Sequence, residues 1–403
     1  MLHYTQGDAV KIAASCLLLL SWATFSPASP LPQVIAAEIY DNLVFVPVSV
    51  NGSTPQDFVL DTGANISIVN QRVAAGLGLV AGPAANARIG TGESAAQVSH
   101  QKHVELRIGD TALPATTVLV TSLSALESRI GHPIAGIIGA DLFKRFVVSI
   151  DYAGDTISLS DSKTYLYAGS GAVLPMRIKG DRPYVSARIT PIGASPIDAF
   201  LIVDSGDTSA LEFHTPYVAK HQLRAATQTL LPHLSKGLAG DSRNWRGRAA
   251  ALRLGVIGID RPLATFAEAT RGSEAESDYD GQIGGEILRR FRVTFNYGDR
   301  TMILEPNAAF AEAFESDMSG LTLNRSAPEF KLLEVESVDM GSAADLAGLM
   351  AGDAIESIDS AGTSSMPLDL ILRMFKQDGA TYLLGIRRGA DTVEFKLQLH
   401  RRI

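Results

Sequence analysis

Two short segments of the sequence carry the same succession of a carboxylate, a hydroxyl group and a glycine between apolar runs. The first, at residues 59–69, is centred on Asp61, and the second, at residues 201–211, is centred on Asp204. Apolar flanks of this kind predict buried strands, and the polar residues between them predict a tight turn. The repetition suggests that the two turns bring their aspartates together across a pseudo-twofold axis.

Such a pair of aspartates has a definite chemistry. Two carboxyl groups in contact cannot both ionise, so they share one proton. The ionised group can take a proton from water while the protonated group donates to a carbonyl oxygen, which places a general base and a general acid in one small unit. Gly63 and Gly206 allow the backbone to turn where a Cβ would clash. The hydroxyl groups of Thr62 and Ser205 can tie the two turns together.

The surroundings of the two turns repeat as well. The aspartates are 143 residues apart, and residues farther along each segment keep nearly the same spacing. Three pairs are 145 residues apart: Gly139 and Gly284, Arg145 and Arg290, and Tyr152 and Tyr297. This regularity indicates an internal duplication with few insertions. Each half runs from a strand through the Asp turn and a long β-rich middle to an apolar-Gly segment, a short helix and a hairpin.

The composition sets the outer limits. The chain has 403 residues, of which 46% are hydrophobic and 19% charged, as expected for a globular protein with two or three domains. Its 36 glycines and many β-branched residues favour β structure. A net charge of −8 without any basic run argues against a nucleic-acid partner. The single cysteine, Cys16, leaves the rest of the chain without a disulfide, a thiolate zinc site or a cysteine nucleophile.

Residues 1–37 have the pattern of a targeting segment. A basic residue precedes an apolar run at residues 12–23, which suits a signal peptide and is short for a membrane span. Small residues allow cleavage after Ala28 or Ala37. We therefore expect an exported protein, either periplasmic or secreted. An uncleaved N-terminal membrane anchor is the alternative.

Taken together, the two turns and their repeated context resemble the aspartic proteases of the pepsin and retropepsin type. In that family each of two β lobes contributes one Asp-Thr/Ser-Gly turn to a dyad in the cleft between them. Each turn packs on an apolar-apolar-Gly segment, and the counterparts here are residues 137–139 and 282–284. The resemblance covers roughly residues 38–310. It implies a two-lobed β fold, with one lobe at residues 38–165 and the other at residues 166–318.

The resemblance also implies roles and partners. Asp61 and Asp204 would be the catalytic residues of an endopeptidase acting on peptides or proteins, without a metal or an organic cofactor. The residues supporting the dyad would be Thr62, Gly63, Ser205 and Gly206. Two alternatives remain open. One is a peptide-binding protein that keeps the lobes but has lost catalysis, and the other is a protease that pairs Asp61 with Asp61 of a second chain.

Two residues depart from the family pattern near the second turn. Asp207 stands where the family has a small or hydroxyl residue, which leaves a third carboxylate beside the dyad. Gln282 replaces an apolar residue. Asp207 either hydrogen-bonds the backbone of Thr208 or Ser209 within its own turn, or it faces the cleft. In the cleft its negative charge would raise the proton affinity of the dyad and keep the half-protonated form to higher pH. The presence of Asp207 is also the feature that favours the alternative of a peptide-binding protein without catalysis.

The first-lobe flap is expected at a glycine-rich tip formed by Gly90, Thr91 and Gly92, which lacks the tyrosine of pepsin. The second-lobe flap is expected somewhere in residues 231–248. The same glycine-rich tip loosely matches a dinucleotide fingerprint, but no strand-turn-helix context surrounds it. Neither a Gly-x-Ser-x-Gly motif nor a His-Glu-x-x-His motif occurs, so serine hydrolase and zinc protease chemistry lack support.

Residues 319–403 resemble a bacterial-type PDZ domain, a small α/β unit. The pattern predicts a strand at residues 332–338, a short helix at residues 342–349 with a serine cap and a glycine end, and a second helix at residues 368–375. In that family a peptide C-terminus adds as a strand. The residues expected beside the peptide are Phe330, Lys331, Leu332 and Leu333. Because the preceding linker is short and polar, we expect this domain to be separable from the dyad.

Overall fold

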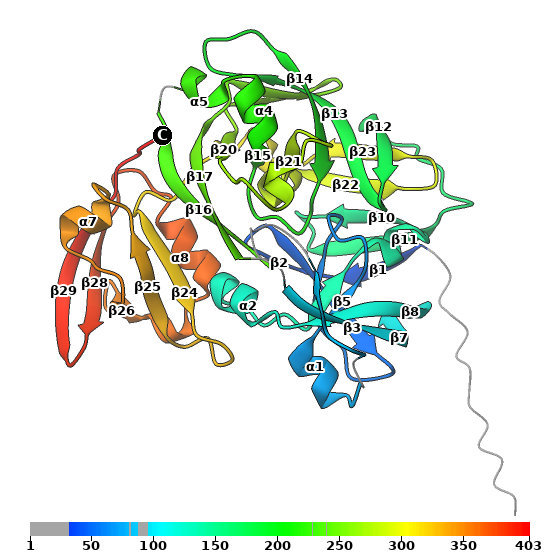
Figure 1. The fold of residues 1–403 in the computed structure, drawn as a ribbon, viewed down its shortest axis with the longest axis horizontal. Coiled ribbons are helices and arrows are strands. Elements are labelled where there is room, and N and C mark those ends of the chain that lie inside the picture. The colour runs from blue at the N-terminus through cyan, green and yellow to red at the C-terminus, as the bar shows by residue number, and fades with distance from the viewer. Residues whose placement is uncertain (1–31, 80–81, 88–95, 228, 239) are drawn as a thin grey trace, which may run out of the picture.

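The computed structural model describes residues 32–403, except residues 80–81, 88–95, 228 and 239. The chain is mostly β, with 47% of its residues in strands and 15% in helices, as the sequence predicts. Figure 1 shows two β-rich bodies side by side and a smaller third body beside them. We call these the first lobe (residues 33–161), the second lobe (residues 172–311) and the C-terminal domain (residues 318–403).

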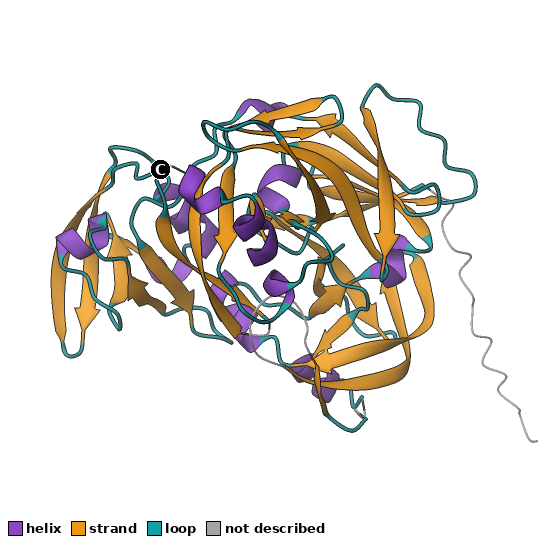
Figure 2. Ribbon diagram, turned by 45° about the horizontal axis from the view of Figure 1, so that its top comes forward, coloured by secondary structure: helices purple, strands orange, loops and turns teal. Residues whose placement is uncertain are grey.

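The first lobe is built on an eight-stranded sheet with the order β2-β3-β4-β9-β5-β8-β7-β6. Its helices are short, and Figure 2 shows the helices of the whole chain as short purple turns beside the longer orange strands. The elements of this lobe are β1 (Gln33–Ala36), β2 (Glu38–Tyr40), β3 (Leu43–Val50), β4 (Gln56–Leu60), β5 (Ile68–Asn70), α1 (Gln71–Gly76), β6 (Ala85–Ala87), β7 (Ala96–Ile108), β8 (Thr111–Thr121), α2 (Ser124–Ile130), β9 (Gly136–Ile138), α3 (Ala140–Phe143), β10 (Phe146–Asp151) and β11 (Thr156–Asp161).

The second lobe repeats much of this order with its own strands. It contains β12 (Ala172–Lys179), β13 (Arg182–Thr190), β14 (Ile197–Val203), β15 (Leu211–Phe213), α4 (Thr215–Lys220), α5 (Leu223–Ala226), β16 (Leu231–Gly237), β17 (Gly240–Arg248), β18 (Ala251–Leu254), β19 (Ile257–Asp260), β20 (Leu263–Ala267), η1 (Ser273–Ala275), β21 (Gly281–Ile283), α6 (Gly285–Leu288), β22 (Phe291–Asn296), β23 (Thr301–Pro306) and η2 (Ala308–Ala311). The short parallel pair β4–β9 of the first lobe corresponds to β14–β21 here.

One sheet joins the two lobes. Strand β10 of the first lobe pairs antiparallel with β22 of the second, and Ser149 faces Thr294 in that register. These two residues are 145 apart in sequence, the same spacing as the duplicated residues, so each is the other's counterpart. Their hydroxyl oxygens are 2.5 Å apart. The pseudo-twofold axis therefore passes between Ser149 and Thr294, and the duplication seen in the sequence becomes a symmetric seam between the lobes.

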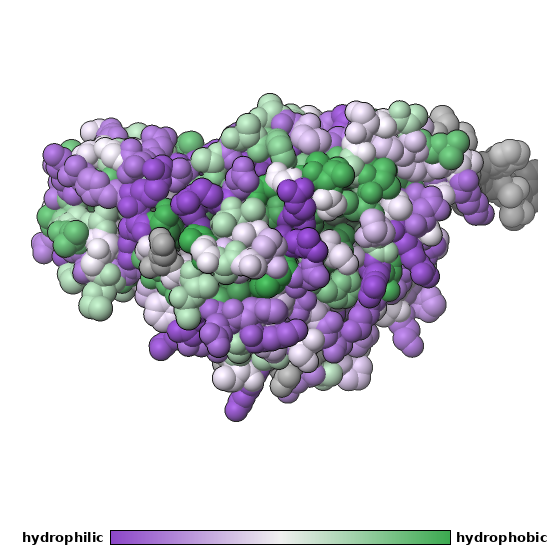
Figure 3. Space-filling view, turned by 90° about the horizontal axis from the view of Figure 1, so that it is seen from above, coloured by the Kyte–Doolittle hydropathy of each residue, from purple (hydrophilic) through white to green (hydrophobic). Residues whose placement is uncertain are grey.

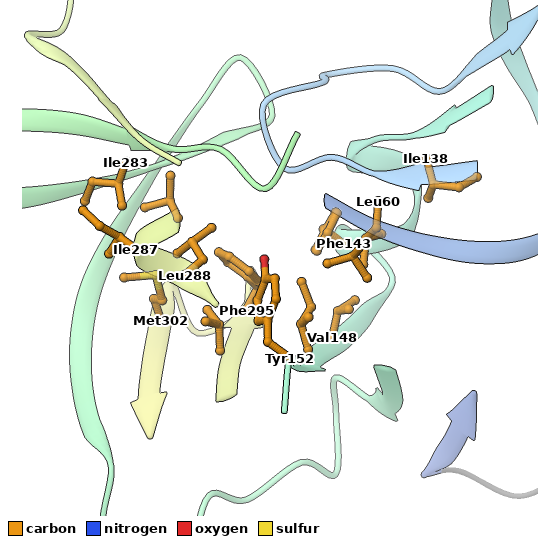
Figure 4. Packing of buried hydrophobic residues seen from close by; sticks show 14 of the residues in the cluster. Leu60, Ile138, Phe143, Val148, Tyr152, Ile283, Ile287, Leu288, Phe295 and Met302 are labelled. Carbon is orange, nitrogen blue, oxygen red and sulfur yellow. The ribbon is translucent and has the colours of Figure 1, made fainter. Parts of the chain in front are cut away.

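A single hydrophobic core runs across this seam. It includes buried residues of both halves, among them Leu60, Phe143, Val203 and Phe295, and Phe143 packs edge-on against Phe295 with ring centroids 5.7 Å apart. Figure 4 shows Leu60 and Phe143 of the first lobe and Phe295 of the second lobe among the side chains of this core. Burial of so much apolar surface fixes the lobes against each other. The strands that carry the Asp turns are thus anchored in common packing.

The C-terminal domain has a separate core of its own. Its sheet has the order β24-β25-β26-β28-β29, with β27 paired to β26. Its elements are β24 (Leu321–Arg325), β25 (Leu333–Val338), α7 (Ala343–Ala347), β26 (Ala354–Ile358), β27 (Ala361–Gly362), η3 (Thr363–Ser365), α8 (Leu368–Met374), β28 (Thr381–Arg388) and β29 (Asp391–Gln398). The caps predicted for α7 are present, because the Ser342 side chain accepts from the Asp345 amide and Gly348 adopts a left-handed conformation.

The predicted peptide-binding segment needs a correction. Leu333 begins β25, which pairs with β24 on one side and β26 on the other, so this strand has no free edge for an added peptide. The carbonyl groups of Phe330 and Lys331 accept hydrogen bonds from the Arg325 guanidinium, and Leu332 links them to the strand. Among the described strands of this sheet, the one with an unpaired edge on this side is β24.

The exposed face drawn in Figure 3 is mostly hydrophilic, with hydrophobic residues gathered toward its centre. Within the described part of the chain, no helix combines the length and the apolar character that a membrane crossing requires.

One buried cation organises the end of the second lobe. Arg290 is fully buried, and its guanidinium donates to the carbonyl groups of Glu286, Ala309 and Glu312. The guanidinium carbon lies 3.6 Å from the centroid of the Phe314 ring. Burial lowers the pKa of Arg290 to about 10, so the group stays charged at neutral pH. Arg290 therefore fastens the segment that leads into the C-terminal domain.

We expect Arg290→Met to lower the free energy of unfolding by about 3 kcal/mol, because several buried carbonyl groups lose their donor. The matched control is Arg145→Met at the duplicated position, where the side chain is exposed and the change should stay within about 0.5 kcal/mol. Urea unfolding of both variants measures the difference. Equal losses would show that Arg290 has no special structural role.

Candidate active site

Both Asp turns follow the same construction. Strand β4 ends at Leu60, and the Asp61 amide then donates to the Ile138 carbonyl at 2.9 Å. In the second lobe the Asp204 amide donates to the Ile283 carbonyl, also at 2.9 Å. Each aspartate therefore leaves its strand at the point where the neighbouring apolar-Gly segment ends. This places the two side chains at equivalent positions on either side of the pseudo-twofold axis.

The hydroxyl residues that follow the aspartates join the two turns directly. Thr62 and Ser205 are both fully buried. The Thr62 hydroxyl donates to the Val203 carbonyl at 2.6 Å and accepts from the Ser205 amide at 3.0 Å. The Ser205 hydroxyl donates to the Leu60 carbonyl at 2.8 Å and accepts from the Thr62 amide at 3.0 Å. This reciprocal set of four hydrogen bonds fixes the distance between the lobes at the site.

The two glycines lie against the opposite aspartates. A Cβ atom built on Gly63 would stand 2.5 Å from Asp204 Oδ2, and one built on Gly206 would stand 2.4 Å from Asp61 Cγ. Only glycine leaves room for this approach. The Gly63 amide also donates to Asp61 Oδ1 at 2.7 Å, and the Gly206 amide donates to Asp204 Oδ1 at 2.9 Å. The glycines thus let the carboxyl groups meet and orient them through their amides.

Burial and mutual contact disfavour ionisation of this pair. Burial raises the pKa of Asp61, although hydrogen bonds from Asp204, Gly63 and Ala64 oppose the rise. The pKa of Asp204 lies well above its ordinary value because of burial, the Asp61 charge and the Asp207 charge. The pair therefore favours a state in which the two carboxyl groups share one proton.

The two unusual residues of the second lobe contact each other. Asp207 Oδ2 accepts from the Gln282 side-chain amide at 2.8 Å, and Asp207 Oδ1 accepts from the Ser209 amide at 2.9 Å. Asp207 points toward Gly284, because a Cβ there would lie 2.6 Å from Asp207 Oδ2. The turn orientation is the one adopted. At the duplicated positions the first lobe has Ala64 and Ile137 in an apolar cluster, so a polar pair has replaced an apolar contact.

Two tyrosines that sequence reasoning left without a role belong to the core at the lobe junction. Tyr152 and Tyr297 are buried, and their hydroxyl groups have no hydrogen-bond partner among the described residues. Burial raises the pKa of both, and the charge of Asp204 adds to the effect. Figure 4 shows Tyr152 packed among hydrophobic side chains of the cluster. Their spacing of 145 residues was the available signal, but it does not reveal what the hydroxyl groups face.

The structure describes only the second of the two predicted flaps. Gly90, Thr91 and Gly92 lie outside the described residues. The region expected to hold the second-lobe flap forms the antiparallel hairpin of β16 and β17. Leu238, in the connection between these strands, packs against the apolar cluster of the first lobe. The second hairpin therefore reaches across to the other lobe.

No group of His, Cys, Asp or Glu suited to holding a metal ion occurs among the residues that the structure describes.

Comparisons with known proteins agree with the geometry over part of the chain. Residues 46–142 match a family model described as aspartyl protease, a range that includes Asp61 and the segment at residues 137–139. Among solved structures, the aspartic proteinase from Irpex lacteus is similar at 12% identity and a TM-score of 0.44, over 70% of this chain and 98% of that one. No protein with a curated description matches the chain. The family match and the β architecture support an aspartic-protease-like fold.

The hydroxyl bridge between the turns gives a direct test. We expect Thr62→Val to lower the free energy of unfolding by about 2–3 kcal/mol, because the buried Ser205 amide loses its acceptor. Thr62→Ser keeps the hydroxyl group and should cost only about 1 kcal/mol for the lost methyl. Chemical denaturation of both variants provides the comparison. If valine were tolerated as well as serine, the bridge would not be holding the turns.

Proposed function

We propose that this protein is an aspartic endopeptidase whose catalytic dyad is Asp61 and Asp204. The observation that carries the proposal is the symmetric placement of the two carboxyl groups, each set against the glycine of the opposite turn. The family match over residues 46–142 supports the same class. Buried carboxyl groups that share a proton are costly to the fold, so their presence at the junction of the two lobes argues for a chemical role.

The residues would act in one cycle. Asp61 takes a proton from a water molecule as the water oxygen attacks the carbonyl carbon of a peptide bond. Asp204 donates its proton to the carbonyl oxygen, which gives a tetrahedral diol. The C–N bond then breaks as the nitrogen takes the proton from Asp61. A hydroxyl proton of the diol returns to Asp204, which leaves an amine, a carboxylic acid and the starting dyad.

Two alternatives to an intramolecular catalytic dyad are each disfavoured by a separate observation. A dyad made from Asp61 of two chains is disfavoured because Thr62 and Ser205 already bond the two turns of a single chain. A peptide-binding protein without catalysis would be favoured if Asp207 blocked the dyad. Asp207 instead accepts hydrogen bonds from Ser209 and Gln282. The orientation of Asp207 therefore supports the enzyme over the binding protein.

We also propose that the C-terminal domain is PDZ-like and recognises peptide segments of substrates or partners. The edge of β24 supports this, since strand addition needs an unpaired edge. Arg325, at the end of β24, donates to the Met366 carbonyl just before α8, so this edge lies near that helix. Helix α2 of the first lobe packs on β24. A peptide would have to share this edge with α2. Export to the periplasm or the medium remains part of the proposal, through the apolar run at residues 12–23. The segment expected to extend to residue 37 is shorter than that, because residues 33–36 form β1 and pair with β11.

The first test is hydrolysis of a denatured protein mixture. We expect Asp61→Asn and Asp204→Asn each to lower kcat by at least about a thousandfold, because the shared proton needs both carboxyl groups. Asp207→Asn serves as the matched control, since it removes a neighbouring carboxylate of the same loop and should leave cleavage in place. Circular dichroism of all three variants checks the fold. Full activity of Asp204→Asn would rule out the intramolecular dyad.

The second test concerns pH. The negative charge of Asp207 raises the pKa of both Asp61 and Asp204. Removing that charge makes loss of the shared proton easier. As the pH rises, the active form with one proton is therefore lost at a lower pH than in the wild type. We expect Asp207→Asn to move the alkaline limb of the kcat/KM profile down by about half to one pH unit. Superimposable profiles would show that Asp207 only shapes its turn.

A further inference from the structure

A single tight turn of the first lobe touches all three parts of the molecule. Asp41 and Asn42 connect β2 to β3 and both have positive φ angles, 46° and 66°. Tyr40, the last residue of β2, precedes them. The three consecutive side chains reach the C-terminal domain, a cavity between the three parts, and the loop after the second Asp turn. We call residues 40–42 the junction turn.

Tyr40 contacts the C-terminal domain. Its side chain is buried, and its hydroxyl oxygen accepts from the Leu368 amide at 2.9 Å and the Asp369 amide at 3.4 Å, at the start of α8. A Cβ built on Gly131 of the first lobe would lie 2.9 Å from the Leu368 Cβ. The start of α8 is therefore packed against the first lobe and held by the tyrosine oxygen.

Asn42 contacts the second lobe beside the dyad. Its side-chain amide donates to the Thr208 carbonyl at 2.9 Å. Its own carbonyl oxygen lies so close to Gly285 that a Cβ there would be 2.5 Å away. The Gly285 amide donates in turn to the Asp207 carbonyl at 2.6 Å. Asn42 therefore holds the loop that begins three residues after Asp204.

Asp41 lies between these contacts in a polar cavity of about 170 Å³. The cavity is lined by residues of both lobes and of the C-terminal domain, including Glu286, Asp317 and Lys376. Burial raises the pKa of Asp41 to about 6, while the charges of Lys376 and Arg129 oppose the rise. The two lobes and the C-terminal domain therefore meet at a polar cavity as well as through apolar packing. Because the cavity is not filled by side chains, the hydrogen bonds of Tyr40 and Asn42 on either side of it help to hold the three parts in place.

The second lobe supplies an internal control. The hairpin between β12 and β13 is the counterpart of the junction turn, with Lys179 in the place of Tyr40 and Asp181 in the place of Asn42. Asp181 also reaches the opposite lobe, where it pairs with Lys144 at 2.8 Å. Lys179 is exposed and pairs only at the surface, with Asp278. The hairpins thus cross between lobes in both directions, and only the first connects onward to a third domain.

We propose that Tyr40 and Asn42 are positioning residues through which the C-terminal domain holds the second Asp turn. The C-terminal domain fixes Tyr40, the rigid turn transmits that placement, and Asn42 fixes the loop at residues 207–209. A displaced α8 would loosen this loop and the Asp204 carboxyl with it. In this proposal the C-terminal domain supports the dyad, in contrast to the expectation that it is separable from it. The consequence for turnover rests on the proposed protease function.

Amide hydrogen exchange of the full chain tests the connection without relying on catalysis. Tyr40→Phe removes one oxygen and keeps the ring packed on Phe45 and His132. We expect exchange to rise about tenfold at residues 204–209, the effect of losing roughly one hydrogen bond's worth of local stability. Asn42→Gly keeps the left-handed turn and should produce the same rise. Lys179→Met, at the duplicated position, should leave residues 204–209 unchanged.

The outcomes separate cleanly. Faster exchange confined to residues 368–375 in Tyr40→Phe would overturn the proposal, because the tyrosine would then brace only the C-terminal domain. An unchanged loop in Asn42→Gly would overturn it as well. If the wild type cleaves peptides, Tyr40→Phe should lower kcat about tenfold with KM unchanged, whereas a rise in KM alone would contradict a role in placing Asp204. A wild type without any peptidase activity would remove the proposed function and leave the exchange result standing.

Discussion

The structure depends on keeping two carboxyl groups in contact in a place where water cannot fully separate their charges. The two carboxyl groups do not stay together by themselves, because two ionised aspartates repel each other unless they share a proton. The restraint comes from Thr62 and Ser205, whose hydroxyl groups and amides bond reciprocally across the lobes. Those bonds are in turn protected by a common hydrophobic core and by the β10–β22 seam. Each layer therefore serves to maintain one short distance between Asp61 and Asp204.

Duplication explains the near symmetry of this arrangement, and the departures from symmetry give the two aspartates different roles. The loop after Asp204 is polar, with Asp207 bonded to Gln282, whereas the first lobe packs Ala64 and Ile137 at those positions. The extra negative charge lies closer in sequence to Asp204 and raises its pKa. A symmetric pair would have no preference for the position of the shared proton. The polar substitution of one lobe removes that symmetry, because the charge of Asp207 has no counterpart beside Asp61 in the first lobe.

The sequence was informative where a local pattern determines a local structure. The Asp-Thr/Ser-Gly turns, the spacing of 145 residues and the Ser342 and Gly348 caps each depend on a few neighbouring residues, and the corresponding strands, symmetry and helix α7 are present. It was not informative about which side chains meet. Asp207 and Gln282 looked like two separate anomalies, since nothing in a sequence reveals a contact between residues 75 apart. The peptide edge was placed on β25 because the pattern predicts a strand but not its neighbours on both sides.

The junction turn shows why this second kind of information matters for function. Tyr40 and Lys179 occupy equivalent places in the duplicated lobes, and a sequence comparison within the chain registers only that they differ. The structure shows that the difference coincides with the attachment of a third domain, because Tyr40 accepts from the first amides of α8 while Lys179 remains at the surface. Duplication alone would give the β2–β3 turn and the β12–β13 turn equivalent contacts. A domain fixed to one hairpin breaks that equivalence. The lobe that it reaches through Asn42 is the one that carries Asp204 and the polar loop of Asp207. The second Asp turn thus differs from the first in two ways, through the nearby charge of Asp207 and through the hydrogen bond from Asn42 to its loop.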